Sequence, residues 1–500
     1  MIDYRPVDKE LALIDLGIIV IYLLSVVAVG WAAGRKQRDI RDYFVGDRDV
    51  PWWAITCSIV ATETSTATFI SIPGLAWAGN MAFMQLVFGF MLGRLIVVAL
   101  FIPLYFRGEL FTAYQVLDER FGPTAKRAAA ALFLATRSVA DGLRLLLTAI
   151  VLGELTGWSI ALSIFITGVA TIIYTYLGGM KAVIWTDVSQ LFIYIIGALV
   201  AGYILVGRIP GGLAEYQAAA EAAGKLQLFD FTFDISKTYT FAAGVLGGTL
   251  LTTATHGTDQ LMVQRYLCAK SPRQASLALL VSGAVIFLQF LLFLLIGVGL
   301  YVFYTHYPPA AAFARPDQVF PTFIISELPK GVVGLVVAAV FAAAMSTLSS
   351  SLNSSATTSL TDFYRPLWKK EASDRHYLSV SRLLTAFWGV VQIVVAIAGA
   401  NANESIVNQV LAVASFTSGP VLGIFFLGVL TRRVTERGAL AGLVTGIVFM
   451  LCVQFALPRL AGVTVAWPWF ALIGSSVTFI SGIVFQWLSG IGRAPTVDAK

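Results

Sequence analysis

The chain has 500 residues, of which 58% are hydrophobic and only 12% are charged, and its mean hydropathy is +0.81. A soluble protein of this size cannot bury so large an apolar fraction, so the composition excludes a soluble globular domain and indicates a polytopic membrane protein. The net charge of +6 is what basic cytoplasmic loops produce and does not require a nucleic-acid partner, and the three cysteines lie too far apart for a metal site or a disulfide framework.

Windows of about 20 apolar residues predict thirteen membrane spans. In chain order they cover residues 12–33, 51–78, 82–105, 126–153, 158–176, 183–206, 239–262, 276–304, 331–360, 379–400, 406–430, 438–458 and 467–489. The first apolar run is too long for the core of a signal peptide, so we expect no cleaved leader. One of the two alternating sets of loops carries most of the lysines and arginines, and the positive-inside rule places that set in the cytoplasm. We therefore expect a multi-pass protein of the plasma (inner) membrane, with the N-terminus outside and the C-terminus in the cytoplasm.

Two of these spans have polar middles. One contains "ITCSIVATETSTATFISIPG" and the other "GVLGGTLLTTATHGTDQLMVQ". Backbone at membrane depth unwinds only where it is buried in protein or lines a cavity, so both spans are predicted to be broken helices. Two broken helices five spans apart indicate an inverted repeat with a binding site at the breaks. The predicted organisation is 1–50 with the first accessory helix, 51–206 as the first five-helix repeat, 207–238 as an extracellular loop, 239–430 as the second repeat, and 431–500 with two accessory helices and a cytoplasmic tail.

The ninth span carries eleven Ser, Thr or Asn side chains within the fourteen positions 346–359. Residues 346, 350, 353/354 and 357 share one helix face, and residue 343 lies one turn before them. Such a face has two interpretations. Small hydroxyl residues let helices pack closely and hydrogen bond to each other. Alternatively, hydroxyls that face the free carbonyls of a broken helix supply the oxygen ligands that a hard cation such as Na⁺ binds.

Five stretches in order resemble the sodium/solute symporter family, whose members include the sodium/glucose, sodium/proline and sodium/sialic acid cotransporters. They are "DYFVGDRDVPWWAITCSIVATETS", "YLGGMKAVIWTDVSQ", "GTDQLMVQRYLCAKS", "AAAMSTLSSSLNSSATTSLTDFY" and "GPVLGIFFLGVLTRRVTERGALAGLVTG". The resemblance implies an all-α fold of the LeuT type, a 5+5 inverted repeat with about thirteen transmembrane helices. It also implies a sodium site shared by the family, formed here by Ala61, Thr64, Ala343, Ser346 and Thr347.

A second sodium position is implied by the resemblance to some members, including the sialic acid branch. It would be formed here by Asp187, Ser346, Ser349 and Ser350. The alternative for Asp187 is a structural salt bridge, and the alternative for the two later serines is helix packing. If the solute is a monoanion, a second sodium ion greatly increases the gradient that can be sustained, so we expect two sodium ions per anionic solute.

The span "RAAAALFLATRSVADGLRLLLTAIVLG" places Arg137 near the middle of the bilayer, with Asp141 at i+4 and Arg144 at i+7 on the same face. These residues could form an internal charge ladder, which leaves one positive charge unless Asp187, Asp259 or Glu63 neutralises it. The resemblance to the sialic acid branch offers the alternative that Arg137 binds a substrate carboxylate. Both interpretations are open from the sequence.

Further substrate candidates lie at or beside the two breaks. They are Glu63, Ser65, Thr68, Gln85, Thr255, His256 and Asp259, and the histidine and the last aspartate also have structural interpretations. The sugar-binding branch has glutamines where this chain has Thr68 and Ala412, although Gln409 lies about one turn from the latter. A hexose is therefore disfavoured relative to an organic anion or an amino acid.

These observations predict a sodium-coupled symporter that imports a small polar solute by alternating access, with Na⁺ as the coupling ion and the lipid bilayer as its surroundings. A sodium/sugar symporter and a proton-coupled transporter of the same fold are the alternatives, and a channel is less consistent with a closed central site. The sequence contains no GxSxG, HExxH or phosphate-binding loop, so we expect no enzymatic activity. A monomer is expected to suffice for function.

Overall fold

The computed structural model describes residues 11–34, 39–309, 312–401 and 406–489. Within these ranges the regular structure is helical, apart from one β-bridge between Val50 and Ala269. Eight of the described helices are long and apolar enough to cross a membrane, and a bent pair makes up to nine. Each predicted span overlaps one or more helices, and the total of thirteen crossings stays a prediction.

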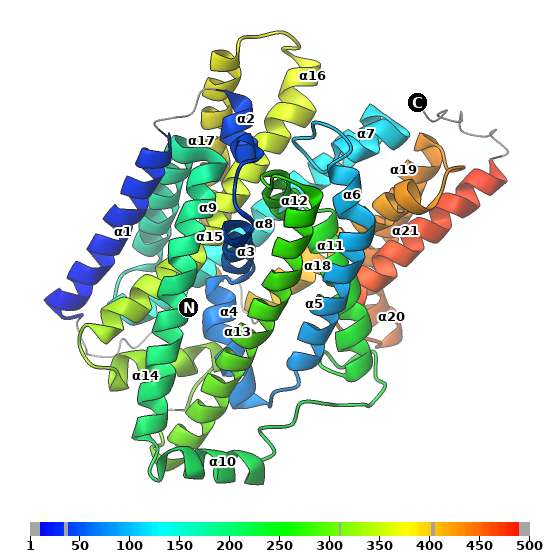
Figure 1. Cartoon of the computed structure of the whole chain (residues 1–500). Helices are drawn as coiled ribbons and strands as arrows, with labels where there is room; N and C mark the ends of the chain where they lie inside the picture. Colours follow the sequence, from blue (N-terminus) through cyan, green and yellow to red (C-terminus); the bar gives the residue numbers. More distant parts are fainter. Residues whose placement is uncertain (1–10, 35–38, 310–311, 402–405, 490–500) are drawn as a thin grey trace.

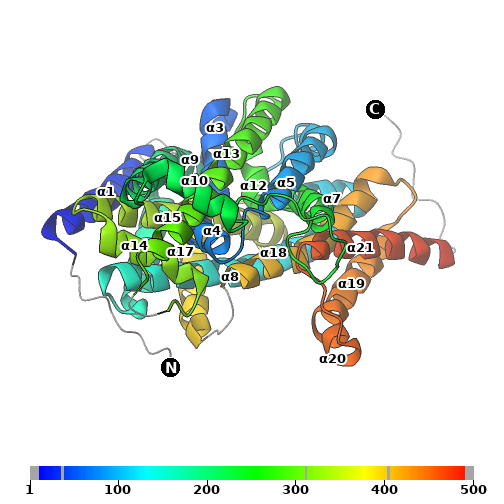
Figure 2. The ribbon, with the colours of Figure 1, turned by 90° about the horizontal axis from the view of Figure 1, so that it is seen from below.

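The helices of at least 12 residues are α1 (Leu13–Gly34), α3 (Trp52–Glu63), α4 (Thr66–Ala78), α5 (Met84–Ile96), α8 (Pro123–Thr156), α9 (Ile160–Arg208), α13 (Pro272–His306), α15 (Val332–Thr358), α17 (Asp374–Ala398), α18 (Ile406–Leu430), α19 (Glu436–Leu451) and α21 (Trp469–Leu488). The shorter ones are α2 (Ile40–Val45), α6 (Ile102–Tyr105), α7 (Gln115–Phe121), α10 (Gly212–Ala222), α11 (Gly248–Gly257), α12 (Gln260–Leu267), α14 (Val319–Glu327), α16 (Arg365–Leu367) and α20 (Leu457–Ala461). Figure 1 shows α10 and α14 at one end of the bundle and α2, α7 and α16 at the other. In the perpendicular view of Figure 2, α1 and α21 lie at opposite sides of the molecule.

The hydroxyl-rich helix α15 lies at the centre of the bundle. In its most apolar window 89% of the residues are buried, against 28% for α1 and α17. It packs against α1, α8, α9 and α17. Because so many of its side chains are Ala, Ser or Thr, neighbouring helices approach it closely, and its polar atoms must find partners inside the protein.

Both predicted breaks are present. The first lies between α3 and α4, where Thr64 (φ −88°, ψ 93°) and Ser65 (φ −87°, ψ 170°) have extended backbone, and the helices on either side are bent by 57°. The second lies between α11 and α12, where Asp259 is extended and its carboxylate accepts a hydrogen bond of 2.9 Å from the amide of Leu261. Each break leaves backbone amides and carbonyls without helical partners, which makes them available to ligands.

Residues 160–208, labelled α9, consist of two helices that meet at a kink, and they correspond to the two spans that the sequence predicts. The backbone departs from helical geometry only at Gly179 (φ 54°, ψ −158°), a conformation that glycine adopts at little cost. This single-residue break lies between the two predicted spans, and Asp187 follows it on the second helix.

Glycines bring α5 and the segment leading into α11 into direct backbone contact. A Cβ atom added at Gly89 would lie 2.4 Å from the carbonyl oxygen of Gly244, whereas one added at Gly17 in α1 would meet nothing within 4 Å. We expect Gly89→Val to lower the free energy of unfolding by about 1–3 kcal/mol through overpacking. Gly17→Val is the matched control, because the intrinsic helix propensities change equally at both positions. Thermal unfolding of the purified variants measures the difference, and equal melting temperatures would contradict the contact.

Candidate functional site

The first break faces α15. Thr347 donates a hydrogen bond from its hydroxyl to the carbonyl of Thr62 at 3.0 Å, and Thr66 donates to the carbonyl of Val340 at 3.2 Å. These two bonds hold the end of α3 and the start of α4 against α15. The expected sodium-site residues Ala61 and Thr64 flank this contact on the broken helix, opposite the α15 segment that contains Ala343 and Ser346.

The chemistry of this region is that of neutral oxygens. Carbonyls at the end of α3 lie where the helical hydrogen-bond ladder stops, and the facing residues of α15 contribute hydroxyls. Hard cations take such oxygens as ligands. The five residues Ala61, Thr64, Ala343, Ser346 and Thr347 are buried, so an ion here would exchange its water for protein oxygen.

A fully buried ion pair lies beside this region. Asp187 of α9 and Arg265 of α12 both have 0% exposed side chains and approach to 3.2 Å between Oδ2 and Nη2. The carboxylate of Asp187 also accepts hydrogen bonds from Ser58 at 2.5 Å and from Ser346 at 2.6 Å. The guanidinium of Arg265 donates to Ser58 at 2.9 Å and also to the hydroxyls of Thr62 and Ser350. The pair joins four helices: α3, α9, α12 and α15.

Of the four residues expected at a second sodium position, three belong to this network. Ser346 and Ser350 contact Asp187 and Arg265 respectively, whereas Ser349 donates its hydroxyl to the carbonyl of Ser346 at 3.1 Å. The positive charge that balances Asp187 here is a guanidinium.

A separate cavity of about 150 Å³ lies between the two breaks and α8. Seven of the predicted substrate candidates line it, namely Glu63, Ser65, Thr68, Arg137, Thr255, His256 and Asp259. Gln85 is not brought to the cavity. Its amide nitrogen donates to the carbonyls of Ala82 and Tyr239 at 3.1 Å each, and its oxygen accepts from the amide of Asp230 at 2.9 Å. Gln85 therefore fastens the segment before α11 to α5.

Glu63 is the acidic group on the first broken helix. Its carboxylate forms a salt bridge with the buried Arg94 of α5, and its other oxygen lies 3.3 Å from Nε2 of His256. Arg94 also donates to the carbonyl of Phe90 at 3.1 Å. Nδ1 of His256 lies 3.1 Å from the hydroxyl of Thr255, so the histidine connects the first break to the second.

The charges on α8 form a ladder that includes the second break. Arg137 forms a salt bridge with Asp259 and a longer contact of 3.5 Å with Asp141. Arg144 donates from Nη1 to the same oxygen of Asp141 at 2.7 Å. Asp259 thus supplies the second negative charge that two arginines require, and the cluster of Arg137, Arg144, Asp141 and Asp259 is formally neutral.

The sequence does not single out Arg94, Arg265 or the aromatic wall of the cavity. The wall consists of Phe83, Phe90 and Phe290, which line the cavity, and the rings of Phe83 and Phe290 stack with centroids 5.1 Å apart. Arg94 could have been identified, because an arginine within an apolar span is a functional candidate by default. Arg265 lies near the end of a predicted span, and nothing local to it indicates that its partner lies 78 residues earlier.

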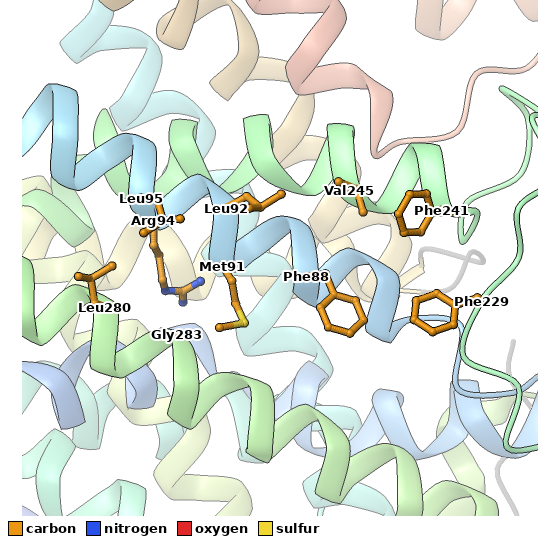
Figure 3. Close-up of a pocket in the computed structure, with 10 residues that line it drawn as sticks. All are labelled: Phe88, Met91, Leu92, Arg94, Leu95, Phe229, Phe241, Val245, Leu280 and Gly283. Carbon is orange, nitrogen blue, oxygen red and sulfur yellow. The ribbon is translucent and has the colours of Figure 1, made fainter.

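A larger, open groove of about 590 Å³ lies on the outer side of α5 and is shown in Figure 3. Its labelled side chains are apolar except for Arg94, whose polar atoms are engaged by Glu63, Ser282 and the backbone of Phe90. Several of its residues, including Leu92 and Leu95, are exposed on the surface. The groove offers no polar group to a hydrophilic solute, so the smaller central cavity is the candidate site.

Comparison with known proteins decides the family. The model of the sodium:solute symporter family matches residues 43–446. The chain belongs to the sodium:solute symporter family. This symporter is 30% identical over 450 residues to the human sodium/iodide cotransporter, covering 88% of this chain and 69% of that protein. It is 29% identical over 442 residues to the bovine sodium-coupled monocarboxylate transporter 2, covering 87% and 71%.

Among solved structures, a Na⁺-coupled sialic acid symporter in a substrate-bound, outward-open state superposes with a TM-score of 0.89 at 26% identity, covering 97% of this symporter and 100% of that chain. These comparisons confirm the predicted family and the LeuT-type fold. They also confirm that the protein is a sodium-coupled transporter, as predicted, and not an enzyme. The symporter is a multi-pass membrane protein that carries a small-molecule solute with Na⁺.

Proposed function

We propose that this symporter imports a small organic anion together with sodium, by alternating access at the two broken helices. The observation that carries this proposal is the central cavity, which is lined by both breaks and by two arginines of α8, beside a region of neutral oxygens. The relatives support an anionic solute, because iodide and monocarboxylates are anions and sialic acid carries a carboxylate.

The coupling ion is assigned to the region where the first break meets α15. Carbonyls of Ala61, Thr64 and Ala343 and hydroxyls of Ser346 and Thr347 would hold Na⁺ there. The solute is assigned to the cavity, where Ser65, Thr68 and Thr255 offer hydroxyls and Arg137 lies among the acidic and basic residues. The two sites share one broken helix, so an ion that orders the break also shapes the solute cavity.

The proposal includes a second sodium ion at Asp187, Ser346, Ser349 and Ser350, with the added condition that Arg265 moves to admit it. The guanidinium of Arg265 hydrogen bonds to Asp187 and Ser350 in this conformation. A sodium ion entering between these oxygens would therefore replace contacts that Arg265 makes now. The ratio of sodium to solute measures whether this exchange occurs.

The proposed organisation follows from the inverted repeat. Residues 51–206 and 239–430 form two five-helix units, 207–238 connects them outside the cell, and the segments 1–50 and 431–500 carry accessory helices. The N-terminus is placed outside and the C-terminus in the cytoplasm of a plasma membrane, and residues 1–10 and 490–500 lie outside the described ranges. We propose that a monomer suffices for function. The side chain of Gln409, weighed above for sugar binding, is also outside the described set.

A thermal-shift screen tests the proposed function on the purified protein. A ligand that binds only the folded state raises the melting temperature. At a concentration one hundred times its Kd it adds about 2.7 kcal/mol to the free energy of unfolding. We expect organic anions to stabilise the protein more in NaCl than in choline chloride, and neutral sugars to have no such effect. Stabilisation by anions in the absence of sodium, with a response to pH instead, would favour proton coupling.

A further inference from the structure

Arg144 is the arginine of the cavity with unused hydrogen-bond donors. Arg94 forms a salt bridge with Glu63, and Arg137 forms one with Asp259. Arg144 makes one side-chain hydrogen bond to the described residues, from Nη1 to Asp141 at 2.7 Å. Its Nε is buried and has no partner in the described part of the chain. The side chain lines the cavity and is 20% exposed.

The free donors of Arg144 lie on one edge of the guanidinium. Nε–H and the outer N–H of Nη2 point in the same direction, with the spacing of the two oxygens of a carboxylate. Nη1 is used by Asp141, and no hydrogen bond to the described residues engages that edge. Arg137 has no comparable edge, because both its terminal nitrogens already contact carboxylates.

The rest of the cavity limits the size and polarity of a carboxylate solute that could bind there. Its wall of Phe83, Phe90 and Phe290 is apolar, and a few hydroxyls lie at the first break. The volume of about 150 Å³ equals that of an engineered protein cavity that binds benzene, a ligand of about six non-hydrogen atoms. A monocarboxylate with a tail of two or three carbons fits these limits, and a sugar acid of about twenty such atoms does not.

We propose that Arg144 is the carboxylate-binding residue of this symporter and that its solute is a short-chain monocarboxylate of about six non-hydrogen atoms. This inference rests on the proposed function and narrows it. Arg137 then acts as a positioning residue, which holds Asp259 and Asp141 and so orients Arg144. The cluster of Arg137, Arg144, Asp141 and Asp259 is formally neutral without solute, so the monoanion adds one negative charge and the co-transported sodium ion offsets it.

Uptake into proteoliposomes tests the proposal, with ¹⁴C-labelled acetate, propionate, lactate and pyruvate as probes and an inward sodium gradient. Arg144→Lys keeps the charge and removes the two-donor edge, so we expect KM for the transported probe to rise at least tenfold while sodium affinity, read from the sodium-dependent thermal shift, stays as in the wild type. Arg41→Lys is the matched control, because Arg41 is exposed and is not among the residues that line the cavity, and we expect an unchanged KM.

An unchanged KM in Arg144→Lys would overturn the proposal, as would sodium-dependent transport confined to solutes other than these four probes. If the variant does not fold, competition on the wild type decides instead. Lactate is expected to inhibit uptake of the labelled probe at least tenfold more strongly than lactamide, which has the same shape without the charge, and equal inhibition would overturn the proposal. A wild-type protein that shows no sodium dependence with any solute would instead contradict the proposed function.

Discussion

Replacing Asp187 by asparagine is expected to lower the free energy of unfolding by about 3–5 kcal/mol. The side chains of Asp187 and Arg265 are both 0% exposed, and the carboxylate accepts hydrogen bonds from Ser58, Ser346 and Arg265. The amide keeps the shape of the side chain and removes its charge, so the guanidinium is left buried without a counter-charge. Thermal or denaturant unfolding of the purified protein measures the loss.

Two further variants isolate the cause. Asp187→Asn combined with Arg265→Met removes both charges, and we expect it to recover most of the lost stability, because replacing a whole buried pair costs far less than breaking it. Asp49→Asn breaks an exposed pair with Lys270 and is expected to change the melting temperature little. If Asp187→Asn and Asp49→Asn had equal melting temperatures, the buried pair would not hold the four helices together.

The second large effect concerns the coupling ion. Ser346→Ala with Thr347→Ala removes two of the five oxygens assigned to sodium, and we expect the apparent sodium affinity to fall at least tenfold, about 1.4 kcal/mol. Sodium titration of the initial uptake rate measures this. Because Ser346 also donates to Asp187, the melting temperature of the double variant must be measured in parallel.

Ser354→Ala with Thr358→Ala is the matched control on the same helix. Ser354 donates its hydroxyl to a carbonyl of its own helix, and Thr358 has no hydrogen-bond partner among the described residues. We expect an unchanged sodium affinity in this variant. A wild-type sodium dependence in Ser346→Ala with Thr347→Ala would remove the assignment of the ion to α15.

The features that the sequence predicts well are those with a local cause. A polar, Gly- or Thr-rich middle in an apolar span has to be a break or a packed face, and both breaks are found at Thr64–Ser65 and Thr258–Asp259. Hydroxyls at helical spacing have to share a face, and those of α15 are buried. The connection between the two helices of α9 is shorter than the loop that the sequence predicts, because a one-residue break at Gly179 resembles a short loop in sequence.

Partners of buried charges are the features that the sequence leaves open. The choice between a structural and a ligand role for Arg137 depends on which carboxylate reaches it, and Asp259 is 122 residues away. Likewise, Glu63 of α3 pairs with Arg94 of α5, and Asp187 of α9 pairs with Arg265 of α12. Three-dimensional packing decides such pairings. The role of Gln85 was likewise not predictable from the sequence, because Tyr239 and Asp230, which it hydrogen bonds, lie in a loop far along the chain.

Simultaneous flux of ²²Na⁺ and a ¹⁴C-labelled monocarboxylate into proteoliposomes tests sodium-coupled anion import most directly. With an inward sodium gradient and no membrane potential, the account predicts that the anion accumulates above its external concentration and that its entry accelerates ²²Na⁺ entry in a fixed ratio. It also predicts that choline in place of sodium abolishes accumulation. Uphill anion uptake without sodium, or sodium entry that is unaffected by any solute, would contradict the account.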